Sequence, residues 1–160
     1  SMTLAKSGLL ALQQIDCRER DIAMMSFYSR WKERPIILDS WFNFSASFPF
    51  NNSLDKVQKL LDHSRFDKKA PNSIRAVLGG FASNIPLFHQ VDGTGYQFMA
   101  DQLIDLDKRN PITASRMVKV FTRWENYCEP YKTNMFSVIK KLSSIELSSN
   151  TKEVIDLMIG

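Results

Sequence analysis

The sequence predicts an all-α fold, in the form of an irregular superhelix (solenoid) of stacked antiparallel helix pairs. Apolar residues recur at spacings of three and four along most of the chain, and no segment keeps the alternating pattern of a strand. Turns divide this pattern into about eight or nine short helices, too many for a four-helix bundle. Because no residue-level repeat is visible, we expect the solenoid to be irregular.

The first third of the chain predicts three helices. The first lies within residues 3–15 and is interrupted near Gly8, and Asp16 is a candidate N-cap for the second. Pro35 precedes the third, which ends at residues 48–52. In chain order, the three apolar faces consist of Leu4, Leu9, Leu10, Leu12 and Ile15; of Met24, Phe27, Tyr28 and Trp31; and of Ile37, Trp41, Phe44 and Phe48.

Two further helices are predicted between residues 53 and 84. Ser53 opens the first, and Asn72 or Ser73 is a candidate cap for the second. Asn84 and Pro86 end the second helix. The two apolar faces consist of Leu54, Val57 and Leu61, and of Ile74, Val77, Leu78 and Phe81.

Four helices are predicted after residue 92. A turn over residues 92–95 starts the first, and the pair Asn110-Pro111 caps and starts the second, because proline suits the first helical turn. The pair Glu129-Pro130 starts the third, and Asn150 and Thr151 are cap candidates for the fourth. Their apolar faces consist of Tyr96, Met99, Leu103 and Leu106; of Met117, Val120, Phe121 and Trp124; of Tyr131, Met135, Val138, Leu142 and Ile145; and of Val154, Leu157 and Met158.

Length and composition predict one globular domain over residues 3–160, with Ser1 and Met2 interpreted as a cloning remnant. No apolar run approaches the roughly 20 residues of a transmembrane helix, and the first residues lack the regions of a signal peptide. The net charge of +4 arises from 21 basic and 17 acidic residues that alternate along the helices. Interspersed charge of this kind is typical of a solvated surface, so we expect neither a nucleic-acid nor a membrane partner.

The spacing of the cysteines and histidines does not predict a self-contained metal site. Cys17 and Cys128 lie far apart without a CxxC pairing, which favours reduced thiols and a cytoplasmic location. The two histidines, His63 and His89, have no partner at metal-ligand spacing, and no HExxH motif is present. We interpret His63 as a partner of the helix dipole near a helix end, and His89 as a loop residue.

The pair Gly79-Gly80 interrupts a helical pattern, where each glycine costs about 1 kcal/mol relative to alanine. Close approach of a neighbouring helix is the favoured explanation, and room for a ligand or another domain is the alternative. The large aromatic residues are interpreted as core rather than as a stacking platform; these are Trp31, Trp41, Phe44 and Trp124.

Two arginines, Arg75 and Arg116, each flank an apolar stripe near a predicted helix N-terminus. A cation gains nothing from the helix dipole at that end, which prefers anions. Either each arginine forms a salt bridge to a nearby Asp or Glu, or it binds an anionic ligand. The residues alone leave both possibilities open.

Three stretches of the chain carry a resemblance to a known family. They are Pro71-Asn-Ser-Ile-Arg-Ala-Val-Leu-Gly-Gly-Phe81, Phe88-His-Gln-Val-Asp-Gly-Thr-Gly-Tyr96 and Arg109-Asn-Pro-Ile-Thr-Ala-Ser-Arg116. These motifs, with Cys17-Arg18, Trp31 and Asp39-Ser-Trp-Phe42 upstream, resemble the C-terminal domain of bacterial aminopeptidase N, a zinc metallopeptidase of the M1 family. The resemblance covers essentially the whole chain.

The resemblance implies a helical superhelix that closes over a catalytic domain and walls off its active-site cavity. It implies that the zinc motif lies upstream, so this chain alone is predicted to be inactive and to hold no metal or other cofactor. It also implies that Arg75 and Arg116 face the cavity and bind peptide substrates, and that the other domains of the same enzyme are the partners. Where this chain has Ile112, the family often has a polar residue, so no hydrogen bond to substrate is carried over to that position.

A freestanding helical-repeat scaffold that binds protein partners is the alternative function. An HExxH motif in frame upstream of this chain would discriminate the two, because a scaffold has no need of a zinc-binding helix.

Overall fold

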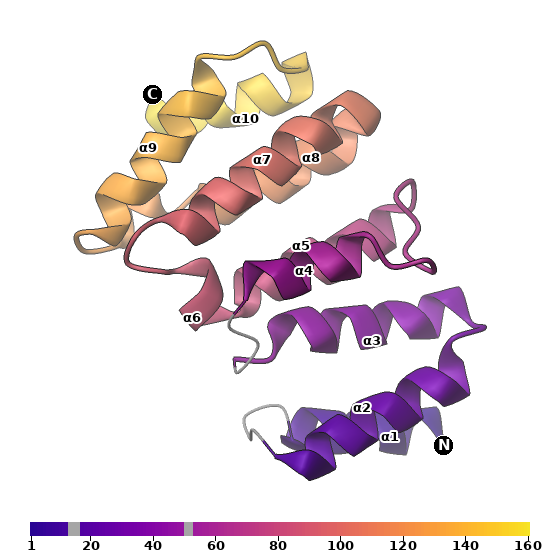
Figure 1. Ribbon diagram of the computed structural model, residues 1–160. Helices are drawn as coiled ribbons and strands as arrows, with labels where there is room; N and C mark the ends of the chain where they lie inside the picture. Colours follow the sequence, from indigo (N-terminus) through magenta and orange to yellow (C-terminus); the bar gives the residue numbers. More distant parts are fainter. Residues whose placement is uncertain (13–16, 50–52) are drawn as a thin grey trace. The chain divides into compact units, whose positions relative to one another are not determined.

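The computed structural model describes residues 1–12, 17–49 and 53–160 (Figure 1). Within these ranges all regular secondary structure is helical, and none of the helices is long and apolar enough to cross a membrane. The chain forms two compact units, Ser1–Leu87 and Phe88–Gly160, which are described separately below.

The first unit contains five helices of eight or more residues in its described part: α1 (Met2–Leu12), α2 (Arg18–Trp31), α3 (Pro35–Ser47), α4 (Leu54–Leu61) and α5 (Pro71–Ser83). The single-turn helix α6 (Ile85–Phe88) follows. The second unit contains α7 (Thr94–Arg109), α8 (Pro111–Met117), the 3-10 turns η1 (Val118–Phe121) and η2 (Trp124–Asn126), α9 (Tyr131–Ser143) and α10 (Ser149–Ile159).

In the first unit, α3 and α5 pack side by side in parallel, and α4 connects them as the returning helix (Figure 1). Near their starts, Ser73 Oγ donates a hydrogen bond of 2.8 Å to Asp39. Near their ends, the buried Asn84 donates through Nδ2 to the carbonyl oxygen of Phe48 at 2.8 Å. Because start pairs with start and end with end, α3 and α5 occupy equivalent places in successive helix pairs, as in a solenoid.

The backbone of α5 approaches α3 closely at Gly80. A Cβ atom at this position would lie 2.8 Å from the carbonyl oxygen of Asn43 and 3.0 Å from Cβ of Ala46. Beside this contact, Asn43 Nδ2 donates to the carbonyl oxygen of Ala76 at 3.2 Å. Close helix packing, the favoured explanation of the glycine pair, is therefore confirmed for Gly80, whereas a Cβ at Gly79 would meet no atom within 4 Å.

A cluster of four buried side chains joins the first three helices: Leu9, Phe27, Phe44 and Phe48. Trp31 and Trp41 pack against this cluster and are partly buried. The sequence assigned both tryptophans to the core, and the structure packs them against it without burying them completely. Aromatic pairs such as Phe27 and Phe44, whose ring centroids lie 6.4 Å apart in an edge-to-face arrangement, add to the burial of apolar surface.

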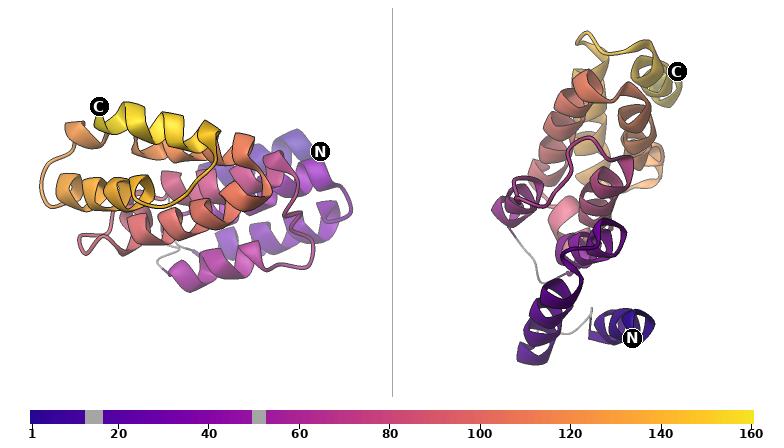
Figure 2. Two further views of the ribbon diagram at one scale, coloured as in Figure 1. Left: turned by 90° about the horizontal axis from the view of Figure 1, so that it is seen from above. Right: turned by 90° about the vertical axis from the view of Figure 1, so that its right-hand side faces the viewer.

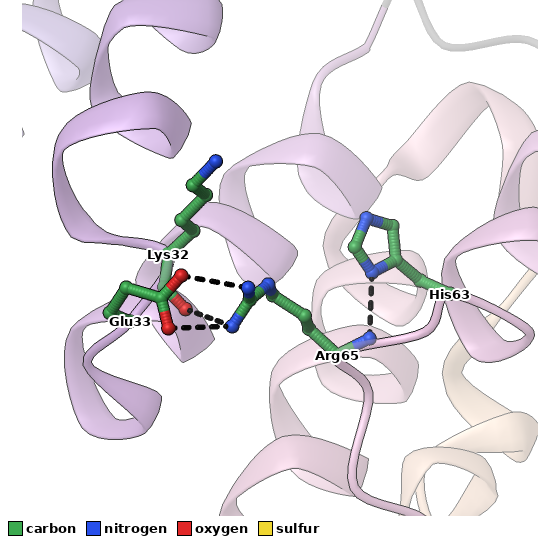
Figure 3. Close-up of polar contacts among 4 residues, drawn as sticks. All are labelled: Lys32, Glu33, His63 and Arg65. Carbon is green, nitrogen blue, oxygen red and sulfur yellow. Dashed lines mark hydrogen bonds and ion pairs between the residues drawn. The ribbon is translucent and has the colours of Figure 1, made fainter.

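Arg65 ties the loop after α4 to the end of α2 (Figure 3). Its two Nη atoms donate to the two carboxylate oxygens of Glu33 at 3.1 and 2.8 Å, and Nη1 also donates to the carbonyl oxygen of Lys32. The Arg65 amide donates to Nδ1 of His63 at 3.0 Å, so His63 caps a turn as a helix-end residue. Because the pair is exposed, it contributes at most about 1 kcal/mol.

In the second unit, alternate helices again stack in parallel. Asn134 Nδ2 at the start of α9 donates to the carbonyl oxygen of Val91 just before α7, and Lys141 at the end of α9 pairs with Asp101 at 3.2 Å. Figure 2 shows α10 beside α9 in the same unit. Thus α9 stacks on α7 in the same direction, and α8 lies between them along the chain as the returning helix, packed against α7 and α10.

Asp107, near the end of α7, holds the start of α10. This aspartate is buried and accepts hydrogen bonds from the Ser148 amide at 2.7 Å, from the Ser148 hydroxyl at 2.6 Å and from the Thr151 hydroxyl at 2.6 Å. Burial alone would raise the pKa of Asp107, but these hydrogen bonds to the charged form outweigh it and lower the pKa. The Ser148 hydroxyl in turn caps α10 through the Thr151 amide.

Several helix boundaries differ from the prediction. Helix α1 runs through Gly8 without interruption, since glycine is tolerated inside a helix. Helix α5 begins at Pro71 and its N-cap residue is Ala70, so neither Asn72 nor Ser73 caps it. The predicted Asp16 cap, Ile15 and residues 50–52 lie outside the described residues; the N-cap of α2 is Cys17, whose sulfur accepts from the Arg20 amide at 3.4 Å.

Two predicted apolar faces were partly wrong. The described part of the first helix buries Leu9 but exposes Leu4 and Leu10. In the last helix, Ile155 is buried, whereas Leu157 is 78% exposed. The faces of α5 and α7, by contrast, are confirmed in full: Ile74, Val77, Leu78 and Phe81, and Tyr96, Met99, Leu103 and Leu106.

The two adjacent glycines of α5 predict opposite responses to the same substitution. Gly80→Leu should lower the free energy of unfolding by about 1–3 kcal/mol, because the new side chain collides with the backbone of α3. Gly79→Leu should raise it by up to about 0.8 kcal/mol, because leucine favours the helix and meets open space. Urea denaturation of both variants checks this pair, and equal destabilisation would contradict it.

Asp107→Asn should lower the free energy of unfolding by about 1–3 kcal/mol at pH 7, because the amide cannot accept all three hydrogen bonds. The pKa of Asp107 is lowered in the folded state, so the aspartate stabilises the fold above pH 4 and loses this effect as the pH falls through its folded pKa. The difference between the variant and the original protein should therefore shrink in acid. Asp105→Asn, at an exposed ion pair, is the matched control and should cost less than about 1 kcal/mol.

Candidate functional site

Arg75 lies in the second turn of α5 and is exposed. The apolar residues of α5 face the interior of the first unit, which leaves Arg75 on the opposite, outer face. Its Nη2 donates to Oδ1 of Asn72, one turn earlier in the helix. Asn72 is a neutral partner, so the positive charge of Arg75 is not balanced by this contact.

Arg116 lies in the last turn of α8, and its side chain is also exposed. The sequence placed it near a helix N-terminus, which is wrong because α8 begins at Pro111 and ends at Met117 instead of continuing to Trp124. At the C-terminal end the helix dipole favours a cation. Arg75 is therefore the only one of the two arginines that lies where the helix dipole disfavours a cation. For Arg116 the helix dipole gives no reason to look for a role beyond the fold.

Within the described residues, neither arginine forms an ion pair with Asp or Glu. The ion pairs of the described structure join other residues, among them Arg65 with Glu33 and Arg109 with Asp105. The salt-bridge alternative is thus absent from the described part of the chain for both Arg75 and Arg116. An exposed guanidinium without a carboxylate partner can bind a carboxylate through two parallel hydrogen bonds.

The structure does not relate Arg75 to Arg116, because they belong to different units. Each arginine is presented by a helix whose start is set by a proline, Pro71 for α5 and Pro111 for α8. The side chain of Asn110 caps α8 by accepting from the Thr113 amide at 3.1 Å, as the sequence predicted. The exposed Ile112 lies one turn before Arg116 on α8.

A partly buried polar pair that the sequence did not predict lies at the start of α7. His89, in the loop after α6, forms a hydrogen bond through Nδ1 with the hydroxyl of Tyr96, which is fully buried. The His89 ring stacks on Tyr127, with a centroid distance of 5.0 Å, and meets Tyr131 edge to face. In the sequence, His89 and Tyr96 lie seven residues apart on either side of a tight turn. This spacing alone does not indicate that the two side chains are in contact.

Burial determines the protonation of this pair. Burial raises the pKa of Tyr96, with smaller contributions from Tyr127 and Tyr131, so the phenol keeps its proton. A buried hydroxyl needs an acceptor, and the neutral ring of His89 supplies it at Nδ1, which assigns the ring proton to Nε2. Burial also lowers the pKa of His89. The pair thus joins the loop before α7 to the buried start of that helix.

In residues 1–12, 17–49 and 53–160, no three His, Cys, Asp or Glu side chains lie close enough together to hold a metal ion. Cys17 and Cys128 are free thiols. The donor groups that the structure describes therefore do not fit a zinc site.

The fold and the exposed arginines define an α-helical repeat module with cationic positions on its outer faces. A family model described as "Domain of unknown function (DUF3458_C) ARM repeats" matches residues 1–160. The chain belongs to this family of ARM-repeat domains, which confirms the predicted all-α solenoid class.

The comparisons also confirm the resemblance to aminopeptidase N. The chain is 33% identical to aminopeptidase N of Haemophilus influenzae over 96% of its own length and 35% identical to that of Escherichia coli over 91%. It covers 18% and 17% of these relatives. A crystal structure of Legionella pneumophila aminopeptidase A in complex with aspartic acid superposes with a TM-score of 0.85 and 35% identity, over 94% of this chain and 18% of that one. The chain thus spans less than a fifth of these proteins.

The His89–Tyr96 pair predicts a pH dependence of stability. Because the pKa of His89 is lowered in the folded state, its contribution is fully present above the unfolded pKa of about 6.5 and is lost as the pH falls through the folded pKa. The free energy of unfolding should therefore decrease between pH 7.5 and pH 5.5. Chemical denaturation at both pH values measures this, and in His89→Gln the decrease should become smaller. An undiminished decrease in that variant would assign the effect to other groups.

Proposed function

We propose that this chain is an accessory domain of a zinc-dependent aminopeptidase of the M1 family, which removes N-terminal residues from peptides. In this proposal the chain closes over the active-site cavity as the C-terminal domain and shapes the access of substrates. The observation that carries it is the pair of exposed arginines without carboxylate partners in the described structure, in a chain that matches aminopeptidase N along nearly its whole length.

The proposal assigns Arg75 and Arg116 to substrate binding. An exopeptidase fixes the amino end of a peptide at its catalytic centre, so the rest of the peptide projects towards the surrounding walls of the cavity. In a short peptide that end is a carboxylate, for which an arginine fork is the best-matched side chain. In an enclosed cavity, such a contact contributes roughly 1.5–3 kcal/mol, compared with at most about 1 kcal/mol in open solvent.

The proposal places the zinc ion and the catalytic groups outside this chain. The described residues contain no set of donors that fits a metal, so the chain alone is expected to be inactive and to bind no cofactor. Its partners are then the other domains of the same polypeptide. Large exposed apolar side chains on the first three helices support such contacts; they include Leu4, Met25 and Ile36. The two free thiols support a reducing, cytoplasmic location.

Arg116→Ala in the complete enzyme should lower kcat/KM for a dipeptide by about ten- to a hundredfold, because the loss of one charge-assisted contact costs roughly 1.5–3 kcal/mol. An aminoacyl anilide, which has no carboxylate, should be affected far less. Steady-state kinetics on both substrates measures the ratio.

Arg109→Ala is the matched control, since Arg109 is an arginine of the same unit that already pairs with Asp105 at 3.2 Å. This variant should not change the preference for the dipeptide. Equal losses on both substrates in Arg116→Ala would mean that Arg116 holds an interface between domains and does not bind the substrate.

A further inference from the structure

Gly79 lies in the middle of α5, and nothing in the described structure requires a glycine there. A Cβ atom at this position would meet no other atom within 4 Å, and its backbone is not in the left-handed region. A glycine inside a helix is destabilising relative to alanine. A helical glycine that the packing does not require therefore suggests a functional reason for the missing side chain. The neighbouring Gly80 has such a reason in the close approach of Asn43, but Gly79 does not.

Gly79 follows Arg75 by four residues, so the two lie one turn apart on the same outer face of α5. Side chains of a helix lean towards its N-terminus and cover the turn before their own Cα atom. A side chain at position 79 would therefore extend over the turn that carries Arg75. Arg75 itself leans away, towards Asn72, to which it donates a hydrogen bond. The absent side chain of Gly79 thus leaves uncovered the helix surface that lies next to the backbone and aliphatic stem of Arg75, on the side from which its guanidinium extends towards Asn72.

We propose that Gly79 determines substrate specificity: its missing side chain gives the carboxyl-terminal part of a short peptide access to Arg75. This inference rests on the proposed function. The peptide chain would lie over the bare backbone at Gly79, and its terminal carboxylate would meet the guanidinium, whose charge has no carboxylate partner in the described structure. A residue with a long side chain at position 79 would block this approach without touching the interior of the unit.

The test uses the complete enzyme with Gly79→Leu and measures kcat/KM for a tripeptide, for the same tripeptide with its carboxyl group amidated, and for an aminoacyl anilide. Gly79→Leu should lower the value for the free tripeptide at least tenfold more than the values for the amidated tripeptide and the anilide. Gly79→Ala adds one methyl group and should have a much smaller effect. In the double variant Arg75→Ala/Gly79→Leu, the second change should add little to the first, because both remove the same contact.

Gly8→Leu is the matched control, because Gly8 is also a helical glycine whose Cβ would meet no atom within 4 Å, but it lies in α1 far along the sequence from Arg75. It should leave the ratio between the three substrates unchanged. Equal losses on all three substrates in Gly79→Leu would overturn the inference and indicate that another domain packs on Gly79. Kinetics like those of the original enzyme would also overturn it.

Failure of the proposed function would be visible in a different measurement. In that case the complete protein with its original sequence would not hydrolyse peptides at all, whatever residue occupies position 79. Failure of the inference alone would leave an active aminopeptidase whose preference for a free carboxylate depends on Arg75 and is insensitive to Gly79→Leu.

Discussion

The parallel stacking of alternate helices is the constraint on which the rest of this structure depends. In each unit one helix supplies an asparagine whose side-chain amide donates to a backbone carbonyl of the stacked level: Asn43 of α3 donates to Ala76 of α5, and Asn134 of α9 donates to Val91, just before α7. In each unit a glycine lies against that asparagine, at Gly80 and at Gly93. A Cβ atom on Gly80 would lie 2.8 Å from the carbonyl oxygen of Asn43, and one on Gly93 would lie 3.1 Å from Cγ of Asn134, so a small residue is needed at each contact. One asparagine and one glycine at each level are too few to produce a visible sequence repeat, so the repeat is recognised in the geometry.

This packing also explains where charged groups can act. Burial of one face of α5 and α7 by stacking leaves the opposite face of each helix for other contacts. Where a buried charge does occur, at Asp107, three hydrogen-bond donors compensate it, so it is a structural group. Arg75 and Arg116 have no such compensation among the described residues. The contrast separates side chains that hold the module together from those that are available to a ligand or another domain.

The features of the candidate site that could be predicted from the sequence are those set by local residue types. Asn110 caps α8 and Pro111 starts it, as their residue types suggest. The start of α5 was placed less well, because it begins at Pro71, before the predicted caps Asn72 and Ser73. The orientation of Arg116 relative to the helix dipole was missed, because the apolar pattern continues beyond Met117 while the backbone changes from α-helix to a 3-10 turn. The Tyr96–His89 contact was missed as well, since a hydrogen bond across a loop leaves no periodic trace in the sequence.

The sequence by itself determined that the chain is helical, where most helices begin, and which family it belongs to, because these depend on local periodicity, capping chemistry and long motifs. Only the tertiary structure decided what each of two identical neighbours does. Gly79 and Gly80 are equivalent in any sequence pattern, yet one lies against the backbone of α3 and the other faces open space. The reason is the rotation of about 100° per residue in a helix, which turns adjacent positions to different surroundings that only the neighbouring helices define.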